Sequence, residues 1–279
     1  MKKAIDRCSR LQTTGIAALF LAFSPLYAFA DAAAEMARKL QNPLANIKSV
    51  MTDNNIDFDV GNDDGTGFGM QLQPVYAIDL PEKGFTLIPR AVIPIVHVEP
   101  GSDKGFLPPP DPSATESVSG ISDSVVQLFY APYTDGDWKW GVGPQVSLPT
   151  ATDDALKGPQ WGGGLAGVLV GNLTPELSFA GIVANHWGEN DFNTMMIQPM
   201  LFYNFAPGKA IAYNAVITAD WNADSSDRWT VPIGLSWNQT IDMGGGHGFD
   251  YMIGPYYNVA RPDGAPRWQI RFMINWLFP

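Results

Sequence analysis

The 279-residue sequence has few of the side chains on which most metal, redox and nucleic-acid sites depend. It holds one cysteine, Cys8, and three histidines, and its 17 Lys and Arg residues are outnumbered by 28 Asp and Glu. A lone cysteine excludes an internal disulfide and a zinc site built on several thiolates. A net charge of −11, without a basic block beyond the first ten residues, argues against binding to nucleic acid.

The residues that are plentiful favour strands and turns. There are 28 Gly, 23 Pro, 9 Trp, 9 Tyr and 15 Phe, while only 16% of the residues are charged. Aromatic residues are enriched in strands, and Gly and Pro mark turns. This composition predicts an all-β protein rather than a helical bundle.

The first 30 residues have the three parts of a secretory signal peptide. Basic residues precede an apolar stretch over residues 16–23, and Ala28-Phe29-Ala30 supplies the small residues that signal peptidase requires. We expect cleavage before Asp31. An uncleaved membrane anchor is the alternative, which the short apolar run disfavours. Cleavage removes Cys8, four basic residues and one acidic residue, and it leaves 13 basic against 27 acidic residues, a net charge of −14.

The mature chain is predicted to be one short helix followed by strands. Residues 31–43 begin with an Ala-rich, helix-favouring run that Pro43 ends, and residues 44–279 form one domain. Within this domain, turn signals separate twelve strand-like segments. They cover residues 48–60, 67–79, 85–98, 121–134, 138–149, 160–173, 176–188, 193–206, 210–222, 229–240, 247–259 and 266–279.

The connections indicate how these segments are arranged. Those after even-numbered segments are short, such as residues 207–209, and those after odd-numbered segments include the longest, above all residues 99–120. An even strand number, with short turns and both termini at one end, is typical of an outer-membrane barrel. We therefore predict an antiparallel, up-and-down transmembrane β-barrel of about twelve strands.

The last segment has the clearest alternation of apolar and polar side chains. The residues of one set are all apolar and predict a face toward lipid: Trp268, Ile270, Phe272, Ile274, Trp276 and Phe278. The residues of the other set are mostly polar and predict a face toward a wet interior: Arg267, Gln269, Arg271, Met273, Asn275 and Leu277. Segments 210–222 and 247–259 alternate in the same way.

Tryptophans and prolines occupy special places in these segments. Five tryptophans fall toward long loops (positions 161, 187, 221, 229 and 268) and four toward short turns (138, 140, 237 and 276). Indole prefers the headgroup level of a membrane, so two aromatic belts are predicted; a soluble sandwich with a tryptophan core is the alternative. Prolines inside segments remove ladder hydrogen bonds, and we expect bulges or bends there: Pro74, Pro89, Pro94, Pro132, Pro144, Pro199, Pro232 and Pro255.

The sequence contains no pattern of residues that predicts an enzyme. His97, His186 and His247 lie in different segments and predict no metal site. Ser178 and His186 would lie about 26 Å apart along one strand, too far for a catalytic pair. The sequence Asp220-Trp221-Asn222-Ala223-Asp224 only begins like a calcium loop, and the Gly-rich stretches lack the Lys of a phosphate-binding loop. We predict no catalytic residues, no metal and no cofactor.

Several motifs resemble one family of bacterial outer-membrane barrels. The match spans almost the whole mature chain, and its segments are residues 37–46 (ARKLQNPLAN), 72–77 (LQPVYA), 141–154 (GVGPQVSLPTATDD), 197–205 (IQPMLFYNF), 218–235 (TADWNADSSDRWTVPIGL) and 256–279 (YYNVARPDGAPRWQIRFMINWLFP). Family members are commonly labelled neuromedin U-like or transporter, and the sequence is similar to barrels of the meta-pathway phenol-degradation family. The resemblance implies transport of hydrophobic compounds. The Pro-rich stretch 101–117 is not one of the family's motifs.

Two functions follow as hypotheses. The first is a Gram-negative, porin-like outer-membrane channel or transporter for small, hydrophobic or aromatic solutes; the second is a closed structural or surface-binding barrel, whose lumen the helix of residues 31–43 plugs. Expected partners are outer-membrane lipid, a small solute and the barrel-assembly machinery, which would recognise the aromatic last strand. In either case we expect Arg90 and Arg271 to be paired in the lumen by acids such as Asp220 and Asp250. The candidate lumen-lining residues are Arg90, Asp220, Asp250, Tyr256, Asn258, Gln269, Arg271 and Asn275.

Overall fold

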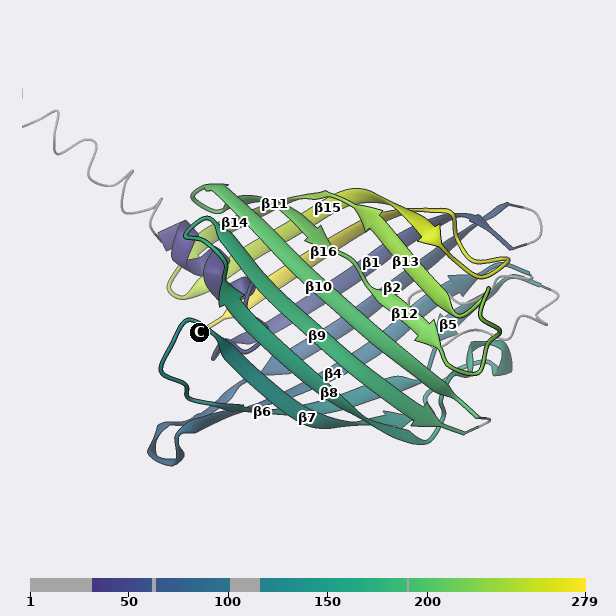
Figure 1. Ribbon diagram of the computed structural model, residues 1–279, viewed down its shortest axis with the longest axis horizontal. Helices are drawn as coiled ribbons and strands as arrows, with labels where there is room; N and C mark the ends of the chain where they lie inside the picture. The colour runs from purple at the N-terminus through teal and green to yellow at the C-terminus, as the bar shows by residue number, and fades with distance from the viewer. Residues whose placement is uncertain (1–31, 62–63, 101–115, 190) are drawn as a thin grey trace, which may run out of the picture.

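The computed structural model describes residues 32–61, 64–100, 116–189 and 191–279. The expected signal peptide and nearly all of the Pro-rich stretch 101–117 lie outside these residues. The described chain forms one antiparallel barrel, which closes where the first strand pairs with the last (Figure 1). Its strands are β1 (Lys48–Val60), β2 (Gly65–Tyr76), β3 (Ile78–Leu80), β4 (Phe85–Val98), β5 (Val118–Ile121), β6 (Ser124–Pro132), β7 (Lys139–Leu148), β8 (Gly162–Asn172), β9 (Leu177–Gly188), β10 (Asn193–Ala206), β11 (Lys209–Asn214), β12 (Ile217–Asp220), β13 (Trp229–Gly234), β14 (Ser236–Gly244), β15 (His247–Ala260) and β16 (Trp268–Phe278).

Within the described residues, these sixteen pieces make up twelve barrel strands, as the sequence predicts. Four strands are each divided in two, so that β2 continues as β3, β5 as β6, β11 as β12, and β13 as β14. Two short 3-10 turns, Pro81–Lys83 and Asp154–Leu156, lie in the connections. A helix covers residues 32–40, and no helix of the described chain is long and apolar enough to cross a membrane.

Side chains meet at the breaks between β11 and β12 and between β13 and β14. Asn214, the last residue of β11, donates its backbone N–H to the hydroxyl of Tyr256 at 3.1 Å. The same hydroxyl lies 2.9 Å from the hydroxyl of Ser236, where β14 begins. Because a buried backbone N–H must find a partner, Tyr256 lets two neighbouring strands break at one level of the wall.

Several of the prolines coincide with interruptions of the ladder. The β13–β15 register shifts between Val231 and Pro232, and the β2–β4 pairing skips Pro74. The β6–β7 pairing skips Pro144, and a Cβ on the preceding residue, Gly143, would collide with the carbonyl of Leu128. A register shift, as expected of a bulge, is thus present at Pro232, whereas Pro74 and Pro144 interrupt the pairing without changing its register. Pro89, Pro94, Pro132, Pro199 and Pro255 pair without a shift, so the expected bulges are absent there.

The outer face of the barrel is apolar and carries aromatic side chains at both ends. Trp161, Trp187 and Trp268 are exposed toward the long loops, and Trp138 and Trp276 toward the short turns. Exposed aliphatic side chains occupy the wall between them, among them Leu165, Val183, Leu235 and Ile253. Two aromatic belts that flank an aliphatic band match the two interfaces and the hydrocarbon layer of a membrane.

Candidate functional site

The barrel lumen is the candidate site, because the inward-facing side chains bring polar groups together out of contact with lipid. In β16, Gln269, Arg271 and Asn275 are buried, while Trp268 and Trp276 are exposed on the outer face. This is the alternation predicted for the last segment. The period of two along a strand places every second side chain inside.

Arg271 lies in an ion pair across the seam that closes the barrel. Its side chain is 1% exposed, and its Nη2 lies 2.5 Å from Oδ2 of Asp53, which is 2% exposed. Strands β1 and β16 pair so that Arg271 stands opposite Asn55 and Asp53 opposite Met273. The two charged residues are thus diagonal neighbours on the lumen face. Asp53 is not among the predicted lumen residues, although it lies in the polar run Thr52-Asp53-Asn54-Asn55 of the first strand.

Asp250 is held by neutral donors instead of by an arginine. It accepts hydrogen bonds from Asn238 at 3.0 Å, Thr240 at 2.6 Å and Asn275 at 3.0 Å. Thr240 and Asn275 are its direct cross-strand neighbours on β14 and β16. Asp250 therefore has three hydrogen-bond donors other than Arg271. We expected Asp250 as an acidic partner of Arg271, but the ion pair of Arg271 forms with Asp53.

The remaining candidate residues also face the lumen or its wall. Arg90 donates from Nη2 to Oε1 of Gln73 at 2.6 Å. Gln269 donates to Asn258 at 3.1 Å, and Asn258 donates to the carbonyl of Pro266 at 2.6 Å. Asp220 is half-buried and lines a cavity in the barrel. The hydroxyl of Tyr256 accepts the hydrogen bond from the backbone N–H of Asn214 in the barrel wall.

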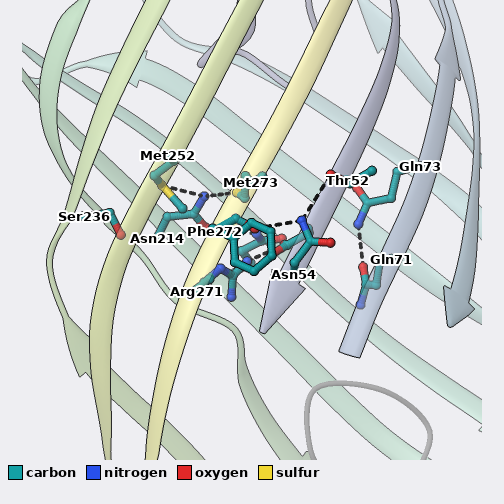
Figure 2. Close-up of polar contacts among 12 residues, drawn as sticks. Thr52, Asn54, Gln71, Gln73, Asn214, Ser236, Met252, Arg271, Phe272 and Met273 are labelled. Atoms are coloured by element: carbon teal, nitrogen blue, oxygen red, sulfur yellow. Dashed lines mark hydrogen bonds and ion pairs between the residues drawn. The ribbon is translucent and has the colours of Figure 1, made fainter. Parts of the chain in front are cut away.

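The lumen has two unlike sides. Residues of β1, β2, β4, β15 and β16 line one side with charges and amides. The other side, mainly on β8 to β11, is apolar in its half toward the short turns: Ala166, Val168, Ala180, Ile182, Ala184, Met200, Phe202, Ala210 and Ala212. Toward the long loops, β9 and β10 carry the buried polar residues His186 and Gln198. Where the two sides meet, the amide of Asn214 contacts the sulfurs of Met252 at 3.8 Å and Met273 at 3.2 Å (Figure 2).

Two cavities follow one another along the lumen. The outer chamber, toward the long loops, has a volume of about 150 Å³ and includes Phe192, Asp227 and Pro262 of those loops in its lining. The inner chamber, toward the short turns, has a volume of about 70 Å³. Arg90 and Gln198 line both chambers and so lie between them.

The helix of residues 32–40 lies at the end of the barrel where the C-terminus also lies (Figure 1). Met36, Ala37 and Leu44 are buried, and Gln41 exchanges side-chain hydrogen bonds of 2.8 and 3.3 Å with Asn204 of β10. Leu40, Gln41 and Pro43 form part of the lining of the inner chamber. The end of the helix and the residues after it therefore reach the inner chamber.

One histidine has a serine partner that sequence spacing did not indicate. Nε2 of His186 lies 2.9 Å from the hydroxyl of Ser147 on another strand, whereas Ser178 contacts Asn204. Nδ1 of His186 has no partner among the described residues, so the acidic group that orients a catalytic histidine is missing there. The described residues also contain no group of three or more His, Cys, Asp or Glu side chains able to hold a metal ion.

Solved structures with a similar fold are outer-membrane channels. The COG4313 outer membrane channel from Pseudomonas putida F1 is 17% identical, with a TM-score of 0.60, over 85% of this chain and 97% of that chain. The NanC porin is 10% identical, with a TM-score of 0.51, over 83% of this chain and 99% of that chain. At sequence identities this low, the similarity shows a shared fold and not a shared solute. Among curated proteins, none matches this sequence significantly.

The sequence also matches a family model, that of the family described as "Putative MetA-pathway of phenol degradation", over residues 51–279. This is the phenol-degradation family whose motifs the sequence resembles, whereas the comparisons give no support to the neuromedin U-like label. The match covers every strand of the barrel after the first few residues of β1. The chain therefore belongs to the MetA-pathway phenol-degradation family of outer-membrane-type β-barrels.

Proposed function

We propose that this protein is an outer-membrane channel for small hydrophobic or aromatic solutes. The observation that carries the proposal is the half of the lumen toward the short turns, in which an apolar wall of Ala, Val, Ile and Met faces a wall of charges and amides. A wide porin is polar on all sides of a water-filled channel. A lumen with one apolar side suits a solute that slides along that side while its polar group stays hydrogen-bonded.

The dimensions of the chambers also favour a small solute. An apolar cavity of about 150 Å³ in another protein is known to take up benzene. The outer chamber is of this size, and the inner chamber is smaller. A solute that passes from one chamber to the other moves past Arg90 and Gln198, which line both.

The location of the protein is part of the proposal. The apolar outer face with its two aromatic belts fits the outer membrane. A signal peptide, cleaved before Asp31, would direct the export of the chain. The barrel-assembly machinery would recognise β16, which presents Trp276 and Phe278 outward near its end. N-terminal sequencing of the protein from outer-membrane fractions tests the cleavage site, with Asp31 as the expected first residue.

A closed structural barrel is the second candidate, and one observation favours it. The end of the helix of residues 32–40 and the following Gln41 line the inner chamber, and Gln41 bonds to β10. If this contact is permanent, nothing passes. Comparison of the wild type with a deletion of residues 31–41 separates the two cases. A removable plug allows the wild type to conduct, whereas a permanent plug allows only the deletion variant to conduct.

Transport is tested in planar bilayers and proteoliposomes. We expect wild-type protein to accelerate the uptake of phenol into vesicles over that of a sugar of higher polarity, and we expect the deletion of residues 31–41 to raise single-channel conductance. Arg271→Ala should shift ion selectivity toward cations, because Asp53 then remains without the cation that it contacts. If all three forms conduct no ions and carry no solute after verified insertion, the channel is refuted and the closed barrel is the better description.

A further inference from the structure

The wall between β2 and β4 is weakly paired over a short stretch, residues 72–78 against 87–93, which we call the β2–β4 seam. Within these described residues, the cross-strand pairs are Leu72–Ile93, Val75–Arg90 and Ile78–Leu87. The flanking ladders are continuous at the same level, since β1 pairs with every residue of β2 from Thr66 to Tyr76, and β6 with every residue of β4 from Phe85 to Val92. The gap therefore belongs to the seam and not to the strands as a whole.

Two prolines lie in the seam, Pro74 on β2 and Pro89 on β4. A wall that opens in a membrane exposes backbone N–H and C=O groups to hydrocarbon, which is costly because no water pairs with them there. Proline has no N–H, so each proline removes one donor that opening would otherwise leave unpaired. The β6–β7 ladder, which is interrupted at Pro144, differs because its strands approach closely at Gly143.

A groove of about 490 Å³ on the lipid-facing side of the barrel lies over the seam. Pro74 and Tyr76 line it from β2 and are exposed, and Pro89 lines it from β4. Val75 and Arg90, which alternate with these residues along the strands and face the lumen, also belong to its lining. The groove thus reaches below the outward-facing side chains to the one cross-strand pair inside the gap.

The groove and the lumen meet at Arg90, which lines the groove and both chambers. Nη2 of Arg90 donates to Oε1 of Gln73 at 2.6 Å, and Gln73 donates to Oε1 of Gln71 at 2.5 Å (Figure 2). Gln73 is a residue of β2 without a backbone partner on β4 among the described pairs. The side-chain bond between Arg90 and Gln73 therefore joins the two strands where the ladder does not, and we call it the latch.

Apolar side chains continue from the groove into the lumen. Val75 packs against the buried apolar cluster, to which Ala77 and Ile88 of the seam belong. A solute that leaves through the end of the barrel passes from this cluster into water. A solute that leaves through the seam passes from the cluster into hydrocarbon, and its apolar surface stays out of water throughout.

We propose that the β2–β4 seam is a lateral exit, through which an apolar solute passes from the lumen into the hydrocarbon layer of the membrane. This inference rests on the proposed channel function and adds the route by which the solute leaves the barrel. Breakage of the latch between Arg90 and Gln73 parts the strands, and the solute moves past Val75 into the groove. No covalent step is involved.

A reversible disulfide across the seam tests the exit. The only cysteine of the sequence, Cys8, lies in the expected signal peptide, so engineered thiols are unique in the mature chain. Pro74→Cys/Ala91→Cys places two thiols at facing positions of the register. A disulfide holds two Cα atoms about 4.4–6.8 Å apart, which includes the spacing of paired strands, so we expect oxidation to slow solute uptake about threefold or more.

The measurement is the uptake of radiolabelled toluene into vesicles with lipopolysaccharide in the outer leaflet and phospholipid in the inner leaflet, with protein-free vesicles as the background. A reductant should restore uptake, and single-channel ion conductance should be the same in both redox states because ions follow the lumen. Gly167→Cys/Val183→Cys is the matched control: these residues are direct partners on β8 and β9, and a Cβ on Gly167 meets no other atom. Its oxidation should leave toluene uptake unchanged.

Photolabelling tests the seam without transport. The wild type is irradiated in phosphatidylcholine that carries a diazirine in the middle of its acyl chain, and mass spectrometry locates the label. We expect label on Val75 and none on Val168, a buried residue of β8 that pairs with both neighbouring strands. Gln73→Leu removes the latch and should raise the labelling of Val75 about two- to tenfold, the effect of one lost hydrogen bond.

The outcomes separate the exit from the channel. If the oxidised seam variant carries toluene as fast as its reduced form, the exit is refuted and the channel stands. Labelling of Val75 no stronger than that of Val168 also refutes the exit, even if the disulfide does not form. Labelling of Val75 in vesicles where no form of the protein carries toluene would refute the channel, and with it the exit of a solute, while the opening of the seam to lipid would stand.

Discussion

The buried ion pair between Asp53 and Arg271 links the first and last strands, and removing one partner should weaken the closed barrel. Breaking a buried pair in this way costs about 3–5 kcal/mol, because the remaining charge keeps its desolvation penalty. Both side chains are at most 2% exposed and their charged atoms lie 2.5 Å apart, so we expect Asp53→Leu to fall in this range. Arg271→Met should have a similar cost, because each charge has a second charged neighbour: Arg90 acts electrostatically on Asp53, and Arg271 on Asp57.

The double variant Asp53→Leu/Arg271→Met removes both charges and fills their space with apolar groups of similar length. Such replacements of buried pairs are often neutral, so its free energy of unfolding should return to within about 1 kcal/mol of the wild type. The assay is reversible urea unfolding in phospholipid vesicles, followed by tryptophan fluorescence. If the losses of the two single variants simply add in the double variant, the charges are not coupled across the seam and the reasoning is wrong.

Three further predictions concern the membrane orientation and the wall. Ile274→Arg places a charge toward lipid on β16 and should lower the free energy of unfolding by about 2–4 kcal/mol, whereas Met273→Arg, on the lumen face, should be tolerated better; folded yield in vesicles compares them. An epitope in residues 103–117 should be accessible on intact cells and one in residues 207–209 should not, and the reverse result would invert the topology. Gly143→Ala should destabilise the barrel by more than 1 kcal/mol, because the added Cβ meets the carbonyl of the neighbouring strand; a melting temperature equal to that of the wild type would contradict the close approach.

Local sequence could not foresee which residues meet across the lumen. The expected partners of Arg271 were acids from strands near the C-terminus, but the register of β1 against β16 brings in Asp53, which is 218 residues away. Likewise, Ser147 meets His186 only because β8 lies between β7 and β9. The division of strands was also unforeseen: no proline stands at the break after Asn214, and the hydroxyl of Tyr256, from another strand, satisfies the freed amide.

The sequence by itself determined the number of strands, their approximate limits and the faces of the last strand. These properties depend on a repeat of two residues and on turn-forming residues between segments, which are local signals that act in every strand. Closure, register and the two-sided lumen were decided only by the tertiary structure. They depend on which strands become neighbours around the ring, and the alternation of any single strand is compatible with many such arrangements.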